Sequence, residues 1–140
     1  MTPRNSFEAW GPQPLWDAPG KIRGIYVGSY GINGWLCEPV LAAGETNAFA
    51  QEFVPKRESS LIPAFFDCAH FETYPRDSDP AVLYHHGAPL DGMSLAALDR
   101  HRSGVNVSFV DGHAEYVTSD GLWKLKWSRG FVAKEVVVRR

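Results

Sequence analysis

The segment from Arg100 to Thr118, RHRSGVNVSFVDGHAEYVT, constrains the fold more than any other part of the chain. Two runs in which apolar and polar residues alternate flank the dipeptide Asp111-Gly112. Alternation with a period of two residues is typical of a half-buried β-strand, and Asp-Gly between two such runs favours a tight turn. The sequence therefore predicts a β-hairpin with Asp111 and Gly112 at its tip.

A two-residue turn at this tip pairs Val107 with Tyr116 and Val105 with Thr118. One face of the hairpin then carries mainly apolar and aromatic side chains, and the other face is mostly polar. The apolar face is predicted to hold Val105, Val107, Phe109, Ala114 and Tyr116. A ribbon with one apolar face needs a second layer to cover it.

The remaining apolar runs are short and are bounded by turn-forming residues. They predict strands at Lys21–Ser29, Leu61–Phe71, Leu122–Trp127 and Phe131–Val138. Pro63 cannot donate a backbone hydrogen bond, so its run is expected at a sheet edge or in a bulge. Asn33-Gly34 indicates a tight reversal of the chain.

Helix signals are sparse. Ser94 is predicted to cap a short helix through Leu98, and Glu45–Phe53 has helical composition between Gly44 and Pro55. We therefore predict an α+β fold, a single domain dominated by an antiparallel β-sheet with one or two short helices. Residues 1–20, rich in Pro and Trp, are expected to form an extended N-terminal segment, and residues 21–140 the globular domain.

The charge balance argues against two classes of partner. The net charge is −2 and the pI is about 6.2, so the chain offers no overall attraction for nucleic acid or for an anionic membrane. The segment Lys124–Arg140 is locally basic, and we interpret it as a solvated face. Hydrophobic residues make up 44% of the chain and charged residues 21%, which is typical of a globular protein.

Four pieces of the sequence resemble one known family. His101, nine further residues and then Asp111-Gly112 match an H-x9-D-G signature. Three other pieces follow the habits and the order of the same family: SYGINGW at 29–35, PAFFDC at 63–68 and LWKLKW at 122–127. The chain is similar in these pieces to the prepilin-type processing-associated family of pseudopilin-like proteins.

The resemblance implies a pseudopilin-head-like fold and a non-catalytic, structural role. The domain would be the globular head of a subunit in a filament of the type II secretion or type IV pilus kind, located in the periplasm or outside the cell. Its partners would be other pilin-like subunits, in a homo-oligomer or filament, if the native protein has the family's N-terminal helix.

That helix is not visible in the sequence. Family members begin with a basic leader, a processing site and a long apolar helix, whereas Met1–Gly20 contains several prolines and no apolar run near the ~20 residues of a membrane span. We expect either that the helix has been removed or that the chain is a natural relative without it. This chain itself is then expected to make no contact with a membrane.

His101 and Asp111 invite interpretation as a catalytic or metal-binding pair. However, the extended arm Val105–Val110 lies between them, and six residues of strand span about 17–20 Å. We therefore expect a structural motif of His101, Asp111 and Gly112. Asp111-Gly112 forms the turn, and His101 hydrogen-bonds at the open end of the hairpin, with Asp120 as the expected partner.

Two sets of residues are candidates for binding a metal. Asp67, His70 and His113 are a transition-metal set, although alternation along a strand places Asp67 and His70 on opposite faces. Asp77, Asp79 and Asp91 are a calcium set, because hard carboxylate oxygens from one long loop suit that ion. The resemblance also implies calcium, since major pseudopilins of type II secretion commonly carry a calcium site in a C-terminal loop. Solvated loop carboxylates are the alternative.

The chain has two cysteines, Cys37 and Cys68, each beside an apolar stretch. They are too few for a cysteine-rich zinc site. Two buried thiols are one interpretation. A single disulfide is the other, if the domain lies outside the cytoplasm as the resemblance implies.

The sequence contains no nucleophile elbow of the Gly-x-Ser-x-Gly type and no glycine-rich phosphate loop. We therefore predict that the protein is not an enzyme. The aromatic share of 13% is expected mostly in the core. The alternative function is a free-standing soluble module that binds a divalent cation or a saccharide through loop carboxylates and exposed aromatic rings.

Overall fold

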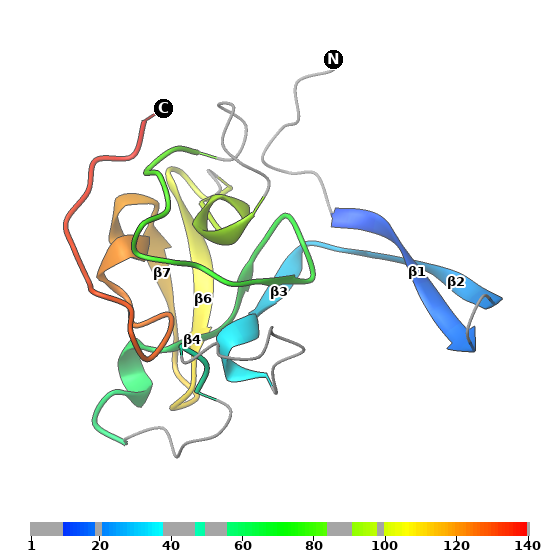
Figure 1. Ribbon diagram of the computed structural model, residues 1–140. Helices are drawn as coiled ribbons and strands as arrows, with labels where there is room; N and C mark the ends of the chain where they lie inside the picture. Colours follow the sequence, from blue (N-terminus) through cyan, green and yellow to red (C-terminus); the bar gives the residue numbers. More distant parts are fainter. Residues whose placement is uncertain are drawn as a thin grey trace.

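The predicted hairpin is present and forms one edge of the domain's large sheet. The computed structural model describes residues 10–18, 21–37, 47–49, 56–83, 91–97 and 100–139, with side chains from residue 29 onward. Strands β6 (Gly104–Phe109) and β7 (Ala114–Thr118) form the hairpin (Figure 1). They belong to a five-stranded sheet with the strand order β5-β3-β4-β6-β7.

The other three strands of this sheet are β3 (Tyr30–Asn33), β4 (Pro63–Asp67) and β5 (Glu72–Thr73). Neighbours pair in antiparallel fashion except β3 and β5, which are parallel. The helical elements among the described residues are short 3-10 turns. They are η1 (Gly34–Leu36), η2 (Ser59–Leu61), η4 (Gly92–Leu95) and η5 (Asp120–Lys124). The predicted fold class, a single domain dominated by an antiparallel sheet, is confirmed.

A separate two-stranded sheet precedes this domain in the chain. Strands β1 (Trp10–Ala18) and β2 (Lys21–Gly28) pair only with each other and stand apart from the larger sheet (Figure 1). The strand predicted at Lys21–Ser29 is therefore confirmed, and residues 10–18 of the N-terminal segment form the strand that pairs with it. Residues 1–9 and most of the helix predicted at Glu45–Phe53 lie outside the described residues.

The predicted register of the hairpin is wrong by one residue. Val105 pairs with Val117 and Val107 with Glu115, and Phe109 N donates to His113 O at 2.9 Å. The loop thus holds three residues instead of two, with Gly112 at φ 93° as its left-handed residue. A shift of one residue exchanges the two faces of a strand.

This exchange is visible in the burial of β7. Tyr116, predicted on the buried face, is 45% exposed, and Val117 is 7% exposed. The β6 half of the prediction holds, because Val105, Val107 and Phe109 are all buried.

We expect Gly112→Ala to lower the free energy of unfolding by about 1 kcal/mol, since an alanine at positive φ is strained. Apart from Gly112 itself and its two chain neighbours, no heavy atom lies within 4 Å of the position its Cβ would take, so backbone conformation sets the cost. Urea denaturation measures the change. Gly112→Asn is the matched variant and should lose less, because asparagine tolerates the left-handed region. Equal losses in the two variants would contradict this explanation.

The proline in β4 is accommodated by a bulge. β4 is a central strand, and its register with β6 shifts between Pro63 and Phe65. Pro63 is the first residue of the strand, where its missing N–H does least harm. Of the two positions expected for Pro63, the bulge is confirmed and the sheet edge is wrong.

Two predicted strands are not strands. Residues predicted as the strand Leu122–Trp127 start within the 3-10 turn η5, where neighbouring Leu122 and Trp123 are both buried. Gly121 N donates to Thr118 Oγ1 at 3.1 Å, which helps the chain to turn directly after β7. Phe131–Val138 is irregular, and only the isolated bridge Val82–Arg139 follows it.

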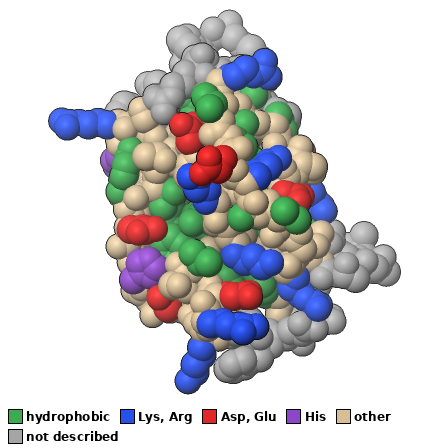
Figure 2. All heavy atoms as spheres, turned by 90° about the vertical axis from the view of Figure 1, so that its left-hand side faces the viewer, with side chains coloured by type: hydrophobic (Ala, Val, Ile, Leu, Met, Phe, Trp, Pro, Cys, Tyr) green, Lys and Arg blue, Asp and Glu red, His purple; other side chains and the backbone are tan. Residues whose placement is uncertain are grey.

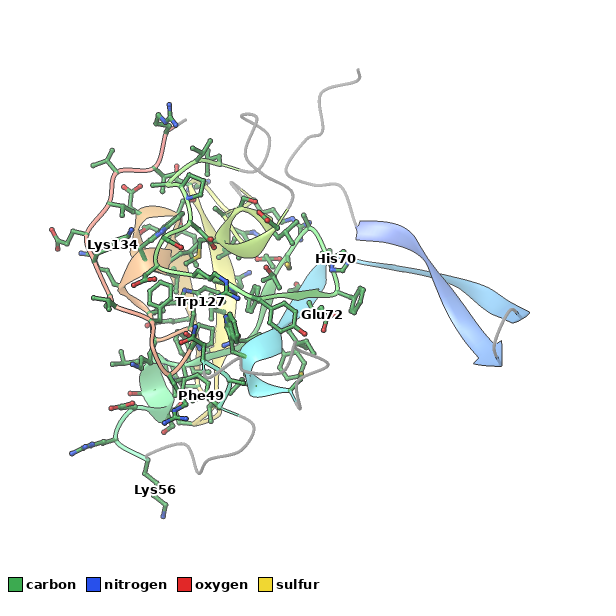
Figure 3. All side chains as sticks on the ribbon, viewed as in Figure 1. Phe49, Lys56, His70, Glu72, Trp127 and Lys134 are labelled. Atoms are coloured by element: carbon green, nitrogen blue, oxygen red, sulfur yellow. The ribbon has the colours of Figure 1, made fainter. Side chains whose placement is uncertain are left out.

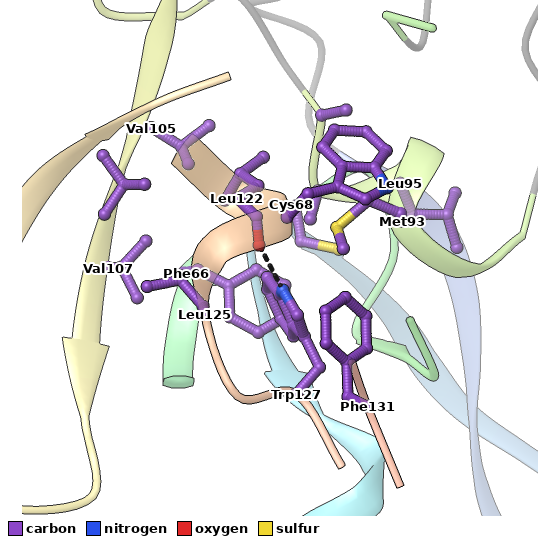
Figure 4. Close-up of a cluster of buried hydrophobic side chains, with 14 of the residues drawn as sticks. Phe66, Cys68, Met93, Leu95, Val105, Val107, Leu122, Leu125, Trp127 and Phe131 are labelled. Carbon is purple, nitrogen blue, oxygen red and sulfur yellow. Dashed lines mark hydrogen bonds between the residues drawn. The ribbon is translucent and has the colours of Figure 1, made fainter. Parts of the chain in front are cut away.

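The core lies between the inner face of the sheet and the segment that follows β7 (Figure 4). Phe66 of β4 meets the ring of Trp127 edge to face, with centroids 4.9 Å apart. Trp127 Nε1 donates to Leu122 O at 2.7 Å, which is the dashed line in Figure 4. Trp123, Leu125 and Trp127 are buried, although they do not form a strand.

Candidate functional site

A buried carboxylate at the end of β4 binds two side chains and one backbone N–H from other parts of the chain. Asp67 is 2% exposed, and its Oδ1 lies 3.3 Å from Arg100 Nη1. Its Oδ2 accepts from Asn106 N at 2.8 Å and lies 3.0 Å from His101 Nε2. Arg100 Nη1 also donates to Ser29 O at 2.5 Å. We call Asp67, Arg100, His101 and Asn106 the Asp67 cluster.

A strained turn holds His101 in this cluster. Arg102 and Ser103 have φ values of 56° and 78°, which non-glycine residues rarely adopt. His101 N donates to Gly104 O at 3.1 Å, closing the turn. Tyr116 Oη donates to Arg102 O at 2.7 Å from β7. Each left-handed residue of this kind costs roughly 1–3 kcal/mol, so surrounding contacts have to keep the turn in place.

His101 lies at the open end of the hairpin, as predicted, but its expected partner is wrong. Its partner is Asp67, whereas Asp120 Oδ1 accepts from Val138 N at 2.8 Å. Asp111 is at the tip, where its Oδ1 lies 2.5 Å from His113 Nδ1. This hydrogen bond lowers the pKa of the Asp111 carboxyl. His101 and Asp111 therefore have different partners at opposite ends of β6.

A second buried polar side chain, Asn33, joins three segments. Asn33 Nδ2 donates to Pro63 O at 3.0 Å and to Trp127 O at 2.9 Å. Its Oδ1 accepts from Trp35 N at 3.2 Å and thereby caps η1. In the sequence, the dipeptide Asn33-Gly34 indicates only a turn at this position. It does not predict the distant partners of the Asn33 side chain.

A pocket of about 330 Å³ opens beside β5, at the side of the domain where Figure 3 labels His70 and Glu72. It lies between β5, the loop after it and η4. Thr73 Oγ1 donates to Gly92 O at 2.5 Å, which ties β5 to η4. Met93 N and Arg76 N both donate to Asp79 Oδ2, at 2.7 and 2.9 Å. These bonds fix Asp79 in the pocket wall.

The pocket is acidic. Glu72, Asp79 and Asp91 line it together with Arg76 and Tyr74. Burial raises the pKa of the Asp79 carboxyl, and the nearby Asp91 carboxylate raises it further, while the two backbone N–H donors lower it. Tyr74 Oη donates to Glu72 Oε2 at 3.3 Å.

The structure separates the members of the predicted calcium set. Asp79 and Asp91 share the pocket, whereas Asp77 lines a smaller hollow of about 80 Å³ beside Ser128. Asp77 O accepts from Lys134 Nζ. Among the residues that the structure describes, no three His, Cys, Asp or Glu side chains come together in a way that could hold a metal ion.

The predicted transition-metal set is not brought together either. Asp67 has His101 as its histidine partner, His70 Nδ1 lies 2.9 Å from Glu72 O, and His113 bonds Asp111. The three predicted residues thus have three different environments.

Both cysteines are free thiols in the structure. Cys68 is fully buried, and burial raises its pKa to about 12. Cys37 is partly exposed, and its pKa is also raised, first by burial and then by Glu72.

We expect dithionitrobenzoate at about pH 8 to modify Cys37 in the folded protein and to leave Cys68 unmodified, because the thiolate is the reacting species. In urea both thiols should react. Absorbance of the released thiolate measures the rates. Equal rates in the folded protein would contradict the burial of Cys68. Reaction of either thiol only after reduction would reveal a disulfide, which is the other interpretation of the two cysteines.

The outer face of the large sheet carries exposed aromatic rings. Tyr30 of β3 and Phe65 of β4 are each 59% exposed, and Tyr116 of β7 joins them on the same face. A different side of the molecule, with the C-terminal segment, shows lysine, arginine and acidic side chains interspersed (Figure 2). There Lys124 Nζ lies 2.8 Å from Glu135 Oε1, so the basic segment is partly neutralised.

In the described part of the chain, no helix has the length and apolar character needed to cross a membrane. Comparisons with protein-family models, curated proteins and solved structures find no match to this chain.

Proposed function

We propose that this domain is the non-catalytic globular head of a pseudopilin-like subunit, part of a secretion or pilus-type filament in the periplasm or at the cell surface. The observation that carries the proposal is where the four resembling pieces lie in the fold. They are residues 29–35, 63–68, 101–112 and 122–127.

The polar side chains of these pieces join the pieces to one another. Asn33 of the first piece donates to Pro63 O of the second and to Trp127 O of the fourth. Asp67 of the second piece bonds His101 and Asn106 of the third. The residues that carry the resemblance therefore serve the architecture of the domain, which supports a structural role for them.

The outer sheet face supplies a surface for contact between subunits. Tyr30 and Phe65 lie diagonally on adjacent antiparallel strands, close enough to form one aromatic patch. Exposed aromatic rings of this kind are enriched where proteins bind one another.

Immunogold electron microscopy of the native cells, with antibodies against the purified domain, tests the proposal. Labelling along filaments or at a secretion complex is the expected result. Labelling confined to the cytoplasm would exclude the proposed role. Phe65→Ser should reduce the labelled filaments without changing the melting temperature. Val132→Ser is the matched control, since Val132 is 65% exposed on the C-terminal segment and is not on the sheet face.

The second candidate is a free-standing module that binds a saccharide or a divalent cation. The aromatic patch of Tyr30 and Phe65 favours the saccharide, because sugar rings stack on exposed aromatic faces. A glycan array distinguishes the candidates: binding lost in both Tyr30→Ser and Phe65→Ser, with no filament labelling in cells, would replace the filament role with this one.

A further inference from the structure

The pocket beside β5 combines ligand-sized space with an excess of negative charge. Its volume of about 330 Å³ falls within the range of small-molecule sites. Glu72 comes from β5, Asp79 from the following loop and Asp91 from the residue before η4. Carboxylates from three separate elements thus converge on one hollow.

Arg76 offsets only part of this charge. Its guanidinium lines the pocket and lies over the ring of Trp35, with Cζ 4.9 Å from the ring centroid. His70 is the other basic side chain in the lining, and three carboxylates against two basic side chains leave the pocket with a net negative charge. The raised pKa of Asp79 is the consequence of an incompletely compensated, partly buried carboxylate.

Asp79 is a preorganised ligand group. Two backbone N–H donors hold Oδ2, and among the described residues no hydrogen bond to Oδ1 is formed. Gly92, at φ 53°, lies directly against this carboxylate, and a Cβ on Gly92 would collide with it. The close approach of η4 therefore depends on glycine, and the open oxygen of Asp79 stays fixed in place.

We propose that this pocket binds the primary ammonium group of a small aliphatic amine, with Asp79 and Asp91 accepting its hydrogen bonds. An ammonium carries three donors, and the Asp79 and Asp91 carboxylates that line this pocket offer acceptors for them. Tyr74 and Leu95 line the same pocket and offer apolar surface to the methylene groups beside the ammonium. The proposal is independent of the filament role.

A metal ion fits the pocket less well. Calcium takes six to eight oxygen ligands at short distance. Asp79 Oδ2 is already engaged by Met93 N and Arg76 N, and no group of three candidate ligands is close enough for a metal within the described ranges.

Isothermal titration of the whole chain with 1,4-diaminobutane tests the proposal, with 1,4-butanediol and calcium chloride as parallel titrations. We expect heat of binding from the diamine and none from the diol. Asp79→Asn and Asp91→Asn should each raise the Kd by about threefold or more, since each removes a charge-assisted hydrogen bond. Asp77→Asn is the matched control and should leave the Kd unchanged, because Asp77 lines the other hollow.

Both aspartate variants are expected to fold, so a change in Kd reports on binding. An asparagine oxygen at position 79 still accepts from Met93 N and Arg76 N, and Asp91 makes no side-chain cap bond to η4. Melting curves check both variants. No diamine binding, or an equal effect of Asp77→Asn, would overturn the proposal. Calcium binding that is lost with Asp79→Asn, without diamine binding, would assign the pocket to a metal.

Discussion

Replacing Asp67 with alanine is expected to lower the free energy of unfolding by about 3–5 kcal/mol, because it breaks the buried ion pair between Asp67 and Arg100. The guanidinium and the carboxylate are both nearly inaccessible to water, with side chains 5% and 3% exposed. The variant also removes the acceptor of Asn106 N, a backbone donor between β4 and β6. The strained turn at Arg102 and Ser103 loses the contact that holds His101.

Urea denaturation of the wild type and the variant measures this loss. Asp111→Ala is the matched control, because it removes an exposed carboxylate that also has a histidine partner. Its loss should be clearly smaller, since exposed ion pairs contribute little. His101→Ala should fall between the two, as His101 is the more exposed partner of Asp67. Equal stability of Asp67→Ala and Asp111→Ala would refute a stabilising role for the Asp67 cluster.

Replacing Trp127 with alanine is expected to cost about 3–5 kcal/mol of unfolding free energy, the usual range for removing a buried aromatic side chain. The indole fills the centre of the core against Phe66. Its N–H donates to Leu122 O at 2.7 Å, and without it Leu122 O keeps only the longer hydrogen bond from Leu125 N at 3.4 Å. The same urea measurement, read by circular dichroism, follows unfolding without depending on the fluorescence of the deleted tryptophan.

Two phenylalanine variants separate the hydrogen bond from the packing. Trp127→Phe loses the bond to Leu122 O, which keeps Leu125 N as a donor, and should cost about 0.5–1.5 kcal/mol in addition to the smaller ring's packing loss. Trp123→Phe is the matched variant, because Trp123 Nε1 is buried without a hydrogen-bond partner in the described part of the chain. It should be the milder of the two. A more damaging Trp123→Phe would show that the indole N–H of Trp127 contributes little.

The hairpin shows how far a local pattern predicts structure. Asp111-Gly112 and the alternating runs are sufficient for the existence of the hairpin and for the burial of β6. They do not distinguish a two-residue turn from a three-residue loop, because both accept glycine at a left-handed position. The one-residue difference in loop length decides whether Tyr116 or Val117 is buried. The buried face of β7 therefore cannot be predicted from the local sequence.

The prediction of a strand at Leu122–Trp127 is wrong for a related reason. Its alternation of apolar and polar residues fits a strand, but burial of Leu122 beside Trp123 fits a 3-10 turn packed on the sheet. The choice depends on the surface that the segment meets, which lies elsewhere in the sequence.

The candidate site was predicted only in part. The sequence marks both Asp67 and His101 as candidate residues, but it does not predict that they pair with each other. The reason is that β4 and the turn before β6 meet only in the folded sheet. The pocket is similar: Asp79 and Asp91 were selected as loop carboxylates, while Glu72 and Tyr74 carried no local signal. Which of these residues lie together depends on contacts between segments that are far apart in the sequence.

The hydrogen bond from Asn33 to Trp127 has a consequence for how the protein is made. It joins residues 94 positions apart, so this hydrogen bond of the Asn33 side chain cannot form until Trp127 has been synthesised. Contacts of such long sequence separation slow folding, because the chain between them has to be ordered first. On the ribosome, β3 and β4 emerge well before their last partner does. The final closure of this domain therefore waits until residue 127 has left the ribosome, and the unfinished sheet needs protection from aggregation until then.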